Sequence, residues 1–296
     1  MPELPDIVVY LESLERLLRG RTIERIEVRS PFLIRSVETD ISAAEGRRIR
    51  GFRRIGKRIV WQLEGDLFLV FHLMIAGRYH WKTKATRPKG KNDLAAFQFE
   101  HGTLMLTEAS PKRRASLHAV QGTAGLADHD PAGLEVLDCD AAAFRDALLS
   151  ENHTLKRSLT SPRLFSGIGN AYSDEILHAA RLSPLKWTSR LSDEEIARLH
   201  MAVQSTLRRW IDQLRQETGT AFPEKVTAFR PQMAVHGRGG EACPVCGTIV
   251  QRIVYAENEC NYCPRCQTGG KLLADRSLSR LLKDDWPKTI DQWEAL

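Results

Sequence analysis

The feature that most constrains this chain is a group of cysteines near its C-terminus. Cys243-Pro-Val-Cys246 is followed, after sixteen residues, by Cys263-Pro-Arg-Cys266. Two Cys-x-x-Cys pairs at this separation can place four thiolates around one Zn²⁺. The chain of 296 residues holds six cysteines, and five of them lie between positions 243 and 266. The cluster predicts a zinc ribbon with one structural zinc, although spacing alone leaves Cys260 and Cys263 as an equally valid second pair.

Composition narrows the class of protein. The length indicates about two domains beside the zinc module. A hydrophobic content of 42% suffices for an ordinary globular core, and no apolar run approaches the roughly 20 residues that cross a bilayer. The N-terminus, Met-Pro-Glu-Leu-Pro-Asp, does not resemble a signal peptide. We therefore expect a cytoplasmic protein without a membrane partner, in a reducing compartment that favours metal binding over disulfides, and a monomer by default.

Basic residues are clustered along the chain. Lys and Arg total 43 against 37 acidic residues, which gives a net charge of +6. The three basic stretches lie at 47–58, 82–91 and 112–114. Each stretch alone fits a solvated surface. Three of them beside a zinc module favour a polyanionic partner such as nucleic acid.

The patterning divides the chain into a β-rich part followed by a helical part. We expect a helix at Ile7–Arg19 with Asp6 as its N-cap and Gly20 at its end. Expected strands are Ile59–Leu63, Leu67–Leu73 and Ala96–Phe99, with hairpin turns at 64–66 and 100–102. Expected later helices are Asp140–Leu149, Thr154–Leu159, Asn170–Ala180 and Ser192–Glu217, with a short helical pattern at Leu278, Leu281 and Leu282.

The N-terminus could carry chemistry. A small second residue permits removal of Met1, which would leave Pro2 with a free secondary amine. The pKa of a terminal amine lies far below that of lysine, so part of it is unprotonated at neutral pH and can attack an electrophilic sugar carbon. Glu3 could shuttle the proton. Many proteins begin with Met-Pro, and on this bias alone catalysis would be the minority interpretation.

Three further motifs are individually weak. Ser166-Gly-Ile-Gly-Asn170 opens an expected helix, whose free N–H groups could hold a phosphate, or it is an ordinary tight turn between helices. Lys57 lies in Gly56-Lys57-Arg58, inside the expected basic strand, where a surface lysine is the default interpretation. His72 is more typical of a satisfied interior histidine than of a ligand.

Taken together, these motifs resemble one family in register. They are Pro-Glu-Leu-Pro-Asp at the start, the Lys57 segment, His-Leu-x-x-x-Gly at 72–77, Gly-Ile-Gly-Asn170, His236-Gly-Arg and the four-cysteine ribbon. The combination is similar to the formamidopyrimidine-DNA glycosylase/endonuclease VIII family, over residues 2–267. The resemblance implies a multi-domain α+β fold. A catalytic β-sandwich with flanking helices would occupy 1–130, a helix–two-turn–helix domain 131–235, a zinc ribbon 236–270, and a tail of unknown role 271–296.

The resemblance also implies roles for single residues. Pro2 would be the Schiff-base nucleophile, Glu3 the proton donor, and Lys57 both a phosphate contact and the proton donor for β-elimination. DNA contacts would come from Lys57, His72, Arg113, Asn170 and Asn258. The family register selects Cys243, Cys246, Cys263 and Cys266 as zinc ligands and leaves Cys260 as a free thiol on the loop. The partner would be double-stranded DNA with damaged bases or abasic sites, and a DNA-bound protein would be associated with the nucleoid.

This sequence departs from the family pattern at several positions. Asn258 stands where the family usually has a phosphate-binding arginine linked to δ-elimination, so we expect β-elimination to dominate. Ile75 stands at the void-filling methionine position, with Met74 one residue early, and a one-residue slip in a strand reverses the face of a side chain. Arg113-Arg114 stands where an Arg-Phe pair is expected. The segment Thr220–Gln232 also differs from the expected lesion-capping loop.

Two other classes of protein fit part of the pattern. A DNA-binding protein that recognises damaged or structured DNA with little or no catalysis would keep the ribbon and the basic segments. It would leave the combination of Pro2, Glu3 and Lys57 without a purpose. A zinc-ribbon module that uses the tail to bind a protein would explain 268–296 but not the N-terminus. The DNA glycosylase with AP-lyase activity is the interpretation that accounts for most residues.

Overall fold

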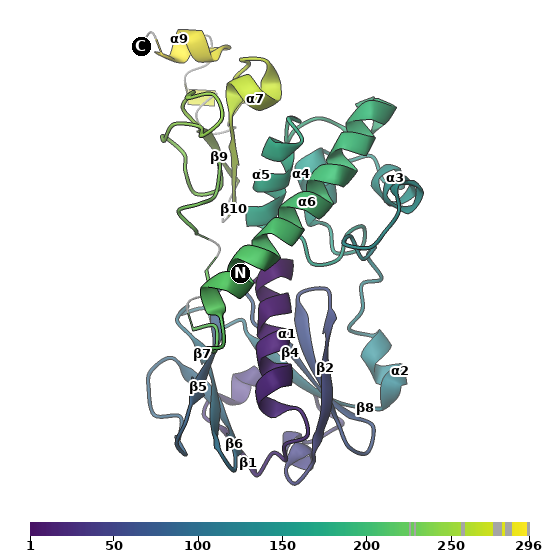
Figure 1. The fold of residues 1–296 in the computed structure, drawn as a ribbon, viewed down its shortest axis with the longest axis vertical. Coiled ribbons are helices and arrows are strands. Elements are labelled where there is room, and N and C mark those ends of the chain that lie inside the picture. The colour runs from purple at the N-terminus through teal and green to yellow at the C-terminus, as the bar shows by residue number, and fades with distance from the viewer. Residues whose placement is uncertain (225, 228, 256–257, 275–279, 282–285, 295–296) are drawn as a thin grey trace. The chain divides into compact units, whose positions relative to one another are not determined.

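Residue contacts group the chain into two units in the computed structural model. The structure describes residues 1–224, 226–227, 229–255, 258–274, 280–281 and 286–294. The N-terminal unit comprises Met1–Pro131 and Trp210–Ala228, and the C-terminal unit comprises Ala132–Arg209 and Phe229–Leu296. The helical segment and the ribbon thus belong to the same unit. The α+β architecture expected from the sequence is confirmed (Figure 1).

The first helix starts earlier than its sequence pattern indicated. Helix α1 runs over Leu4–Leu18 with Glu3 as N-cap, so the expected start at Ile7 with Asp6 as N-cap was wrong. Pro5 is tolerated because an N–H in the first turn has no partner within the helix. Asp6 instead reaches back, and its Oδ2 accepts a hydrogen bond from the Glu3 backbone N–H at 3.0 Å. This arrangement fixes the backbone next to Pro2.

Two antiparallel four-stranded sheets make up the sandwich of the N-terminal unit. One has the order β1-β6-β7-β5, with β1 Arg25–Val28, β6 Asp93–Phe99, β7 Gly102–Glu108 and β5 Gly77–Lys82. The other has the order β2-β3-β4-β8, with β2 Ile49–Ile55, β3 Arg58–Leu63, β4 Leu67–His72 and β8 Ser116–Gln121. The expected strands match β3, β4 and β6, although Leu73 lies one residue beyond the end of β4. The expected turns join β3 to β4 and β6 to β7.

An aromatic cluster joins the two sheets of the sandwich. The Trp61 side chain on β3 is fully buried, and its ring centroid lies 4.9 Å from that of Phe71 on β4 and 5.2 Å from that of Phe97 on β6. Tyr10 of α1 meets Tyr79 of β5 edge to face at 5.5 Å. Buried aromatic rings remove large apolar areas from water, so this cluster supplies much of the hydrophobic stabilisation of the unit.

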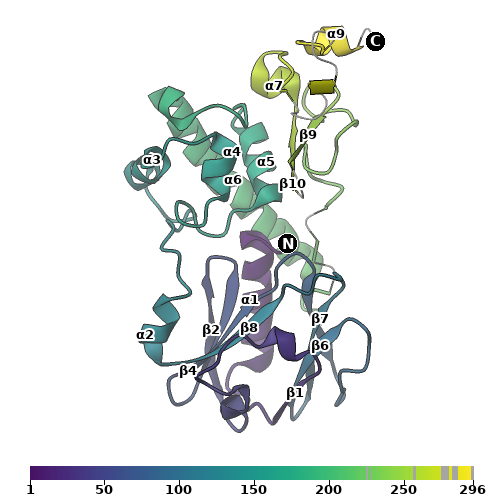
Figure 2. The same ribbon diagram turned by 180° about the vertical axis from the view of Figure 1, so that it is seen from behind.

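Short elements complete the N-terminal unit. They are the 3₁₀ turns η1 Pro31–Leu33 and η2 Ile41–Ala44 and the helix α2 Gly122–Ala127. Figure 2 shows α2 beside β8. Leu126 of α2 is buried with Val60, Phe68 and Val70 on the outer face of the second sheet.

The C-terminal unit begins with helices. They are α3 Ala141–Leu149, α4 Leu155–Thr160, α5 Asn170–Ala179 and α6 Asp193–Thr218, with the 3₁₀ turn η3 Thr188–Arg190. These bounds lie close to the ranges expected from the sequence. Asp140 caps α3, since its Oδ1 accepts from the Ala143 N–H at 2.8 Å. Residues of α6 from Trp210 onward group with the N-terminal unit.

The ribbon and part of the tail follow. The ribbon consists of the antiparallel pair β9 Gln251–Tyr255 and β10 Asn258–Tyr262, then α7 Pro264–Thr268, and the tail contains α9 Ile290–Glu294. Of the expected helical pattern in the tail, Leu278 and Leu282 lie outside the described residues. None of the helices among the described residues combines the length and apolar character needed to cross a membrane.

Candidate functional site

The N-terminus lies in a partly buried, charged environment. Pro2 and Glu3 are both buried, Glu3 with 2% of its surface exposed. Burial lowers the pKa of the Met1 terminal amine below its ordinary value, with Arg78 and Lys57 acting in the same direction and Glu3 and Asp6 opposing them. The amine, two carboxylates and two cations therefore lie within electrostatic reach of one another in the N-terminal unit.

Lys57 occupies a turn rather than the interior of a strand. The expectation of a basic strand through Gly56-Lys57-Arg58 was wrong, because β2 ends at Ile55 and β3 begins at Arg58. Gly56 has φ of 58°, a left-handed conformation that allows the tight reversal. The hairpin places Lys57 at its tip, where its charge helps to lower the pKa of the terminal amine and the pKa of His72.

His72 is an uncharged hydrogen-bonding group at neutral pH. It ends β4, opposite Arg58 in the register of β3 and β4. Burial lowers its pKa to about 4, and the nearby Arg58 and Lys57 act in the same direction. Its Nδ1 accepts a hydrogen bond from the Met74 backbone N–H at 3.1 Å. Because Nδ1 accepts, the neutral ring carries its proton on Nε2, which is then a donor.

The segment after His72 is a tight turn, which changes the interpretation of Met74 and Ile75. Neither residue lies in a strand, so the one-residue offset between them does not place their side chains on opposite faces of a sheet. Met74 has φ of 51°, and the Ile75 side chain is 55% exposed at the turn. A Cβ on Gly77 would lie 2.2 Å from the Leu73 carbonyl oxygen, so the turn requires glycine there.

Arg113 lies in a loop that a buried carboxylate holds in place. Glu108, 2% exposed, accepts hydrogen bonds from the backbone N–H groups of Arg114 at 3.0 Å and Ala115 at 3.1 Å. Arg113 has φ of 40°, an uncommon conformation for a residue with a side chain. Its guanidinium donates to the Lys91 carbonyl at 2.6 Å. Sequence reasoning missed Glu108, because its role depends on contacts across a loop.

Asn170 starts the helix that follows the glycine turn. Gly169 is the N-cap of α5, and Gly167 has φ of 84°, so the two glycines shape the turn as the sequence indicated. The Asn170 carbonyl accepts from Lys156 Nζ of α4 at 2.6 Å. The first turn of a ten-residue helix presents N–H groups that suit an anion.

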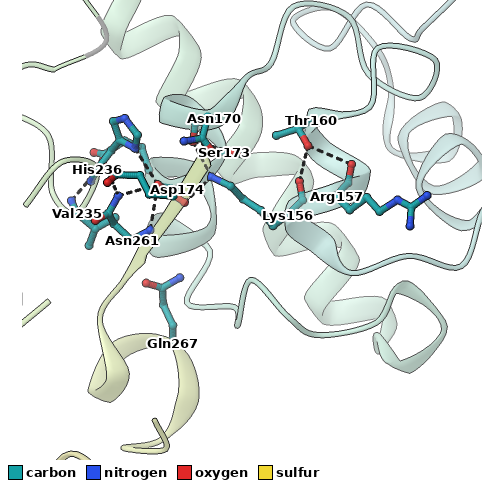
Figure 3. A network of polar contacts seen from close by, with 12 residues as sticks. Lys156, Arg157, Thr160, Asn170, Ser173, Asp174, Val235, His236, Asn261 and Gln267 are labelled. Atoms are coloured by element: carbon teal, nitrogen blue, oxygen red, sulfur yellow. Dashed lines mark hydrogen bonds and ion pairs between the residues drawn. The ribbon is translucent and has the colours of Figure 1, made fainter. Parts of the chain in front are cut away.

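Asp174 is the centre of a buried polar network (Figure 3). Its Oδ1 accepts from Lys156 Nζ at 2.5 Å, and its Oδ2 accepts from His236 Nδ1 at 2.8 Å. The same Oδ2 accepts from the Asn261 backbone N–H at 3.2 Å. One side chain of α5 therefore contacts α4, the chain at His236, and β10.

Glu175, the next residue, binds a backbone segment. Its carboxylate accepts from the backbone N–H groups of Ala234 at 2.8 Å, Val235 at 2.9 Å and His236 at 3.0 Å. Three donors on one carboxylate fix the chain where it enters the ribbon. Neither acid stood out in the sequence, since Asp-Glu within a helix is typical of a solvated face.

The four cysteines of the two Cys-x-x-Cys pairs converge. Their sulfur atoms all lie within 4.8 Å of one another. Within the described part of the chain, these four cysteines are the group of three or more potential metal ligands that lie this close together. Individual Sγ–Sγ distances are 3.4 Å for Cys246 to Cys263, 3.5 Å for Cys266 to Cys246 and 3.9 Å for Cys243 to Cys266. Tetrahedral Zn²⁺ with bonds of about 2.3 Å separates its sulfurs by about 3.8 Å, so the group fits one structural zinc.

Cys260 is excluded from the zinc site, but it is not on a loop as expected. It lies in β10 and is 1% exposed, packed with Ile253 and Tyr262. Its sulfur does not belong to the group of four found among the described residues, and burial raises the pKa of its thiol. Asn258 is the first residue of the same strand, paired with Tyr255.

Comparisons with known proteins agree with this arrangement. Models of the formamidopyrimidine-DNA glycosylase N-terminal domain, its H2TH domain, and a zinc finger found in FPG and IleRS match residues 1–115, 131–221 and 240–269. A formamidopyrimidine-DNA glycosylase of Heliobacterium modesticaldum is 33% identical over 285 residues, which cover 90% of this chain and 100% of the relative.

Solved structures of the same kind resemble the fold. A Lactococcus lactis FPG mutant in complex with a Fapy-dG containing DNA matches with a TM-score of 0.80 and 26% identity, covering 90% of this chain and 100% of the other. A complex between Lactococcus lactis Fpg and an abasic site containing DNA matches with a TM-score of 0.79 and 27% identity, over 90% and 99% of the two chains.

The fold and the zinc site define a DNA-binding enzyme of base-excision repair. The chain belongs to the formamidopyrimidine-DNA glycosylase family, whose members are DNA glycosylases with AP-lyase activity. The zinc is structural and single. The matched models end at residue 269, so the tail lies beyond them.

Substitution Asp174→Asn should destabilise the C-terminal unit by about 3–5 kcal/mol, because it leaves the Lys156 ammonium, 14% exposed, without a counter-charge. The matched control is Asp193→Asn, which removes a 78% exposed partner of Arg145 and should cost less than about 1 kcal/mol. Urea unfolding followed by circular dichroism measures both. Equal midpoints for the two variants would contradict the role of the network.

The same carboxylate predicts a pH dependence. Burial alone raises the pKa of Asp174, but Lys156 and His236 outweigh it, so the pKa lies below its ordinary value. The contribution of Asp174 to stability is therefore present above the ordinary carboxyl pKa and is lost as the pH falls through the depressed value. The stability lost on acidification should be smaller in Asp174→Asn than in the wild type.

Proposed function

We propose that this chain removes damaged bases from double-stranded DNA by attack of the Pro2 amine on C1′ of the damaged nucleotide. The observation that supports this most is the environment of the N-terminus, where burial lowers the pKa of the Met1 amine, Glu3 opposes this effect, and Arg78 and Lys57 add to it. Removal of Met1 would place the amine on Pro2, which is itself buried. An unprotonated secondary amine is the form that can act as a nucleophile.

The proposed reaction removes the base first and then cuts the strand. The damaged nucleotide leaves the base stack, because C1′ is out of reach inside it. The Pro2 nitrogen forms a bond to C1′ while the N-glycosidic bond breaks, and the departing base takes up the proton that the amine releases. Glu3 then shuttles a proton to O4′ as the C1′–O4′ bond breaks, which opens the sugar ring and leaves an iminium between Pro2 and C1′. The resulting iminium acidifies the C2′–H bond. Glu3, now a carboxylate, takes the C2′ proton, the C3′–O bond breaks and the 3′ phosphate leaves, with Lys57 as the proton donor for this β-elimination.

Contacts to the DNA backbone would come from both units. Lys57 offers a charge and His72 an uncharged N–H donor, while Arg113 lies on a loop held by Glu108. In the C-terminal unit, the start of α5 at Asn170 offers backbone N–H groups to a phosphate. Asn258 would add a hydrogen bond without charge. Such contacts make binding strongly salt-dependent and would hold the protein on nucleoid DNA.

The related complexes support a range of substrates. The DNA in the Lactococcus lactis structures contains Fapy-dG in one case and an abasic site in another. We propose that this chain acts on DNA with a base lesion of this kind and on abasic sites. We also propose that the four segments expected from the sequence, 1–130, 131–235, 236–270 and 271–296, are its functional domains and tail.

Borohydride should trap a covalent complex between the protein and duplex DNA that contains an abasic site. The adduct is expected when the mature N-terminus is Pro2 and should be absent when retained Met1 or a tag blocks that amine, because only a free secondary amine forms the reducible iminium. Intact-mass analysis identifies the N-terminus, and a C-terminally tagged form is the control. If neither form is trapped while both bind the DNA, the chain is a damage-binding protein without catalysis.

Cleavage of abasic DNA should give mainly β-elimination products. Asn258 carries no charge where the family usually has an arginine linked to δ-elimination, so the second phosphate should leave slowly. Denaturing gels resolve the two product ends. Asn258→Arg should raise the share of 3′-phosphate ends, and Asn258→Gln, which adds no charge, should not. Mainly 3′-phosphate ends from the wild type would overturn this expectation.

Excision of 8-oxoguanine opposite cytosine should be weak. The residues at the positions that fill the void left by a flipped base are Ile75 and Arg114 in place of methionine and phenylalanine. Single-turnover kinetics on matched duplexes measure the effect, and Ile75→Met should increase the rate on this substrate while leaving cleavage of abasic DNA unchanged. Robust excision by the wild type would show that these substitutions do not limit the substrate range.

A further inference from the structure

A histidine of helix α5 contacts one of the zinc-binding cysteines. The Nε2 atom of His178 lies 3.3 Å from Sγ of Cys243. Both side chains are inside the C-terminal unit, with His178 6% exposed and Cys243 2% exposed. The sequence pattern did not indicate this contact, since the two residues are 65 positions apart.

The chemistry of the zinc site fixes the direction of this hydrogen bond. A cysteine bound to Zn²⁺ is a thiolate, which can accept a hydrogen bond but has no proton to donate. The Nε2 atom must therefore carry the proton and donate it to Sγ. Four thiolates and one Zn²⁺ carry a net charge of −2, so a donor aimed at one sulfur stabilises a site that is otherwise rich in negative charge.

A second side chain connects the same two parts of the unit. Gln267 in α7 accepts from the Cys263 backbone N–H at 2.8 Å and donates to the Leu182 carbonyl at 3.0 Å. Leu182 lies three residues after the end of α5, so the segments that carry the zinc-binding cysteines are bonded to this helix region at two places. The Cys243 loop is itself closed by the Gly247 N–H, which donates to the Cys243 carbonyl at 2.9 Å.

We propose that His178 is a positioning residue of the zinc site, which holds the Cys243 thiolate through an Nε2–H donor and makes zinc retention depend on helix α5. The helix that begins at Asn170 thus also supports the metal through His178, two turns further along. This inference concerns the metal site alone and does not rest on the proposed attack by Pro2.

Zinc affinity of the full-length protein tests the proposal, measured by competition with a chromophoric chelator. His178→Phe keeps a ring but removes the donor, and it should weaken zinc binding by about 10–100-fold, the usual effect of losing such a partner. His178→Gln keeps an N–H donor near the Nε2 position and should remain close to the wild type.

The control is His200→Phe in the same unit. His200 donates to the Cys139 carbonyl at 3.1 Å and packs on Phe144 at 5.0 Å, away from the four zinc-binding cysteines. It should leave zinc affinity unchanged. Equal affinity in His178→Phe and the wild type would overturn the proposal, and equal weakening in His178→Phe and His178→Gln would reduce His178 to a packing role.

A measurement on the wild type covers the case in which His178→Phe does not fold. Long-range ¹H–¹⁵N NMR spectra of the zinc-loaded protein distinguish the two histidine tautomers. The ring of His178 should carry its proton on Nε2. A proton on Nδ1 alone would leave no donor toward Cys243 and would refute the proposed bond, whatever the outcome of the DNA-trapping experiment.

Discussion

The carboxylate of Asp174 is the interaction on which the C-terminal unit most depends. A buried charge is costly unless partners satisfy it. Here Lys156, His236 and Asn261 do so from three different segments of the chain. An unpaired, buried Asp174 would raise the free energy of the folded state. The network therefore requires α4, β10 and the chain at His236 to be in place together. The network therefore selects one arrangement of the helices and the ribbon (Figure 3).

Helix α5 carries this arrangement along its length. Its first turn presents Asn170, its middle presents Asp174 and Glu175, and its last turn presents His178. The first turn has the backbone N–H groups and the dipole that suit a phosphate. The remaining residues bind the ribbon and the zinc site. A ten-residue helix can thus order a turn whose N–H groups suit an anion and a metal site at once, because both are fixed to the same rigid element.

How far the sequence predicts the molecule depends on the range of the contacts. Local signals located the β-rich and helical parts, and the spacing of Cys243 and Cys246 against Cys263 and Cys266 located the metal site. Local signals failed where a distant contact or a turn decides the structure. Pro5 allowed α1 to begin early, and the Gly56 reversal moved Lys57 from a strand to a turn. The Asp174 network joins residues 62 and 87 positions apart, and no local pattern encodes such a pairing.

The electrostatic environment of the N-terminus differs from that of the buried Asp174 network. The Asp174 network pairs opposite charges, whereas the terminal amine lies among charges of both signs whose effects oppose each other. Burial, Arg78 and Lys57 lower the pKa of that amine, while Glu3 and Asp6 raise it. DNA phosphates that neutralise Lys57 would remove one cause of the depressed pKa. Closure of the site around a nucleotide would strengthen the contribution of burial. The proposed attack by Pro2 needs an amine that stays unprotonated in the complex, and for the Met1 amine burial is the largest of the causes that shift the pKa.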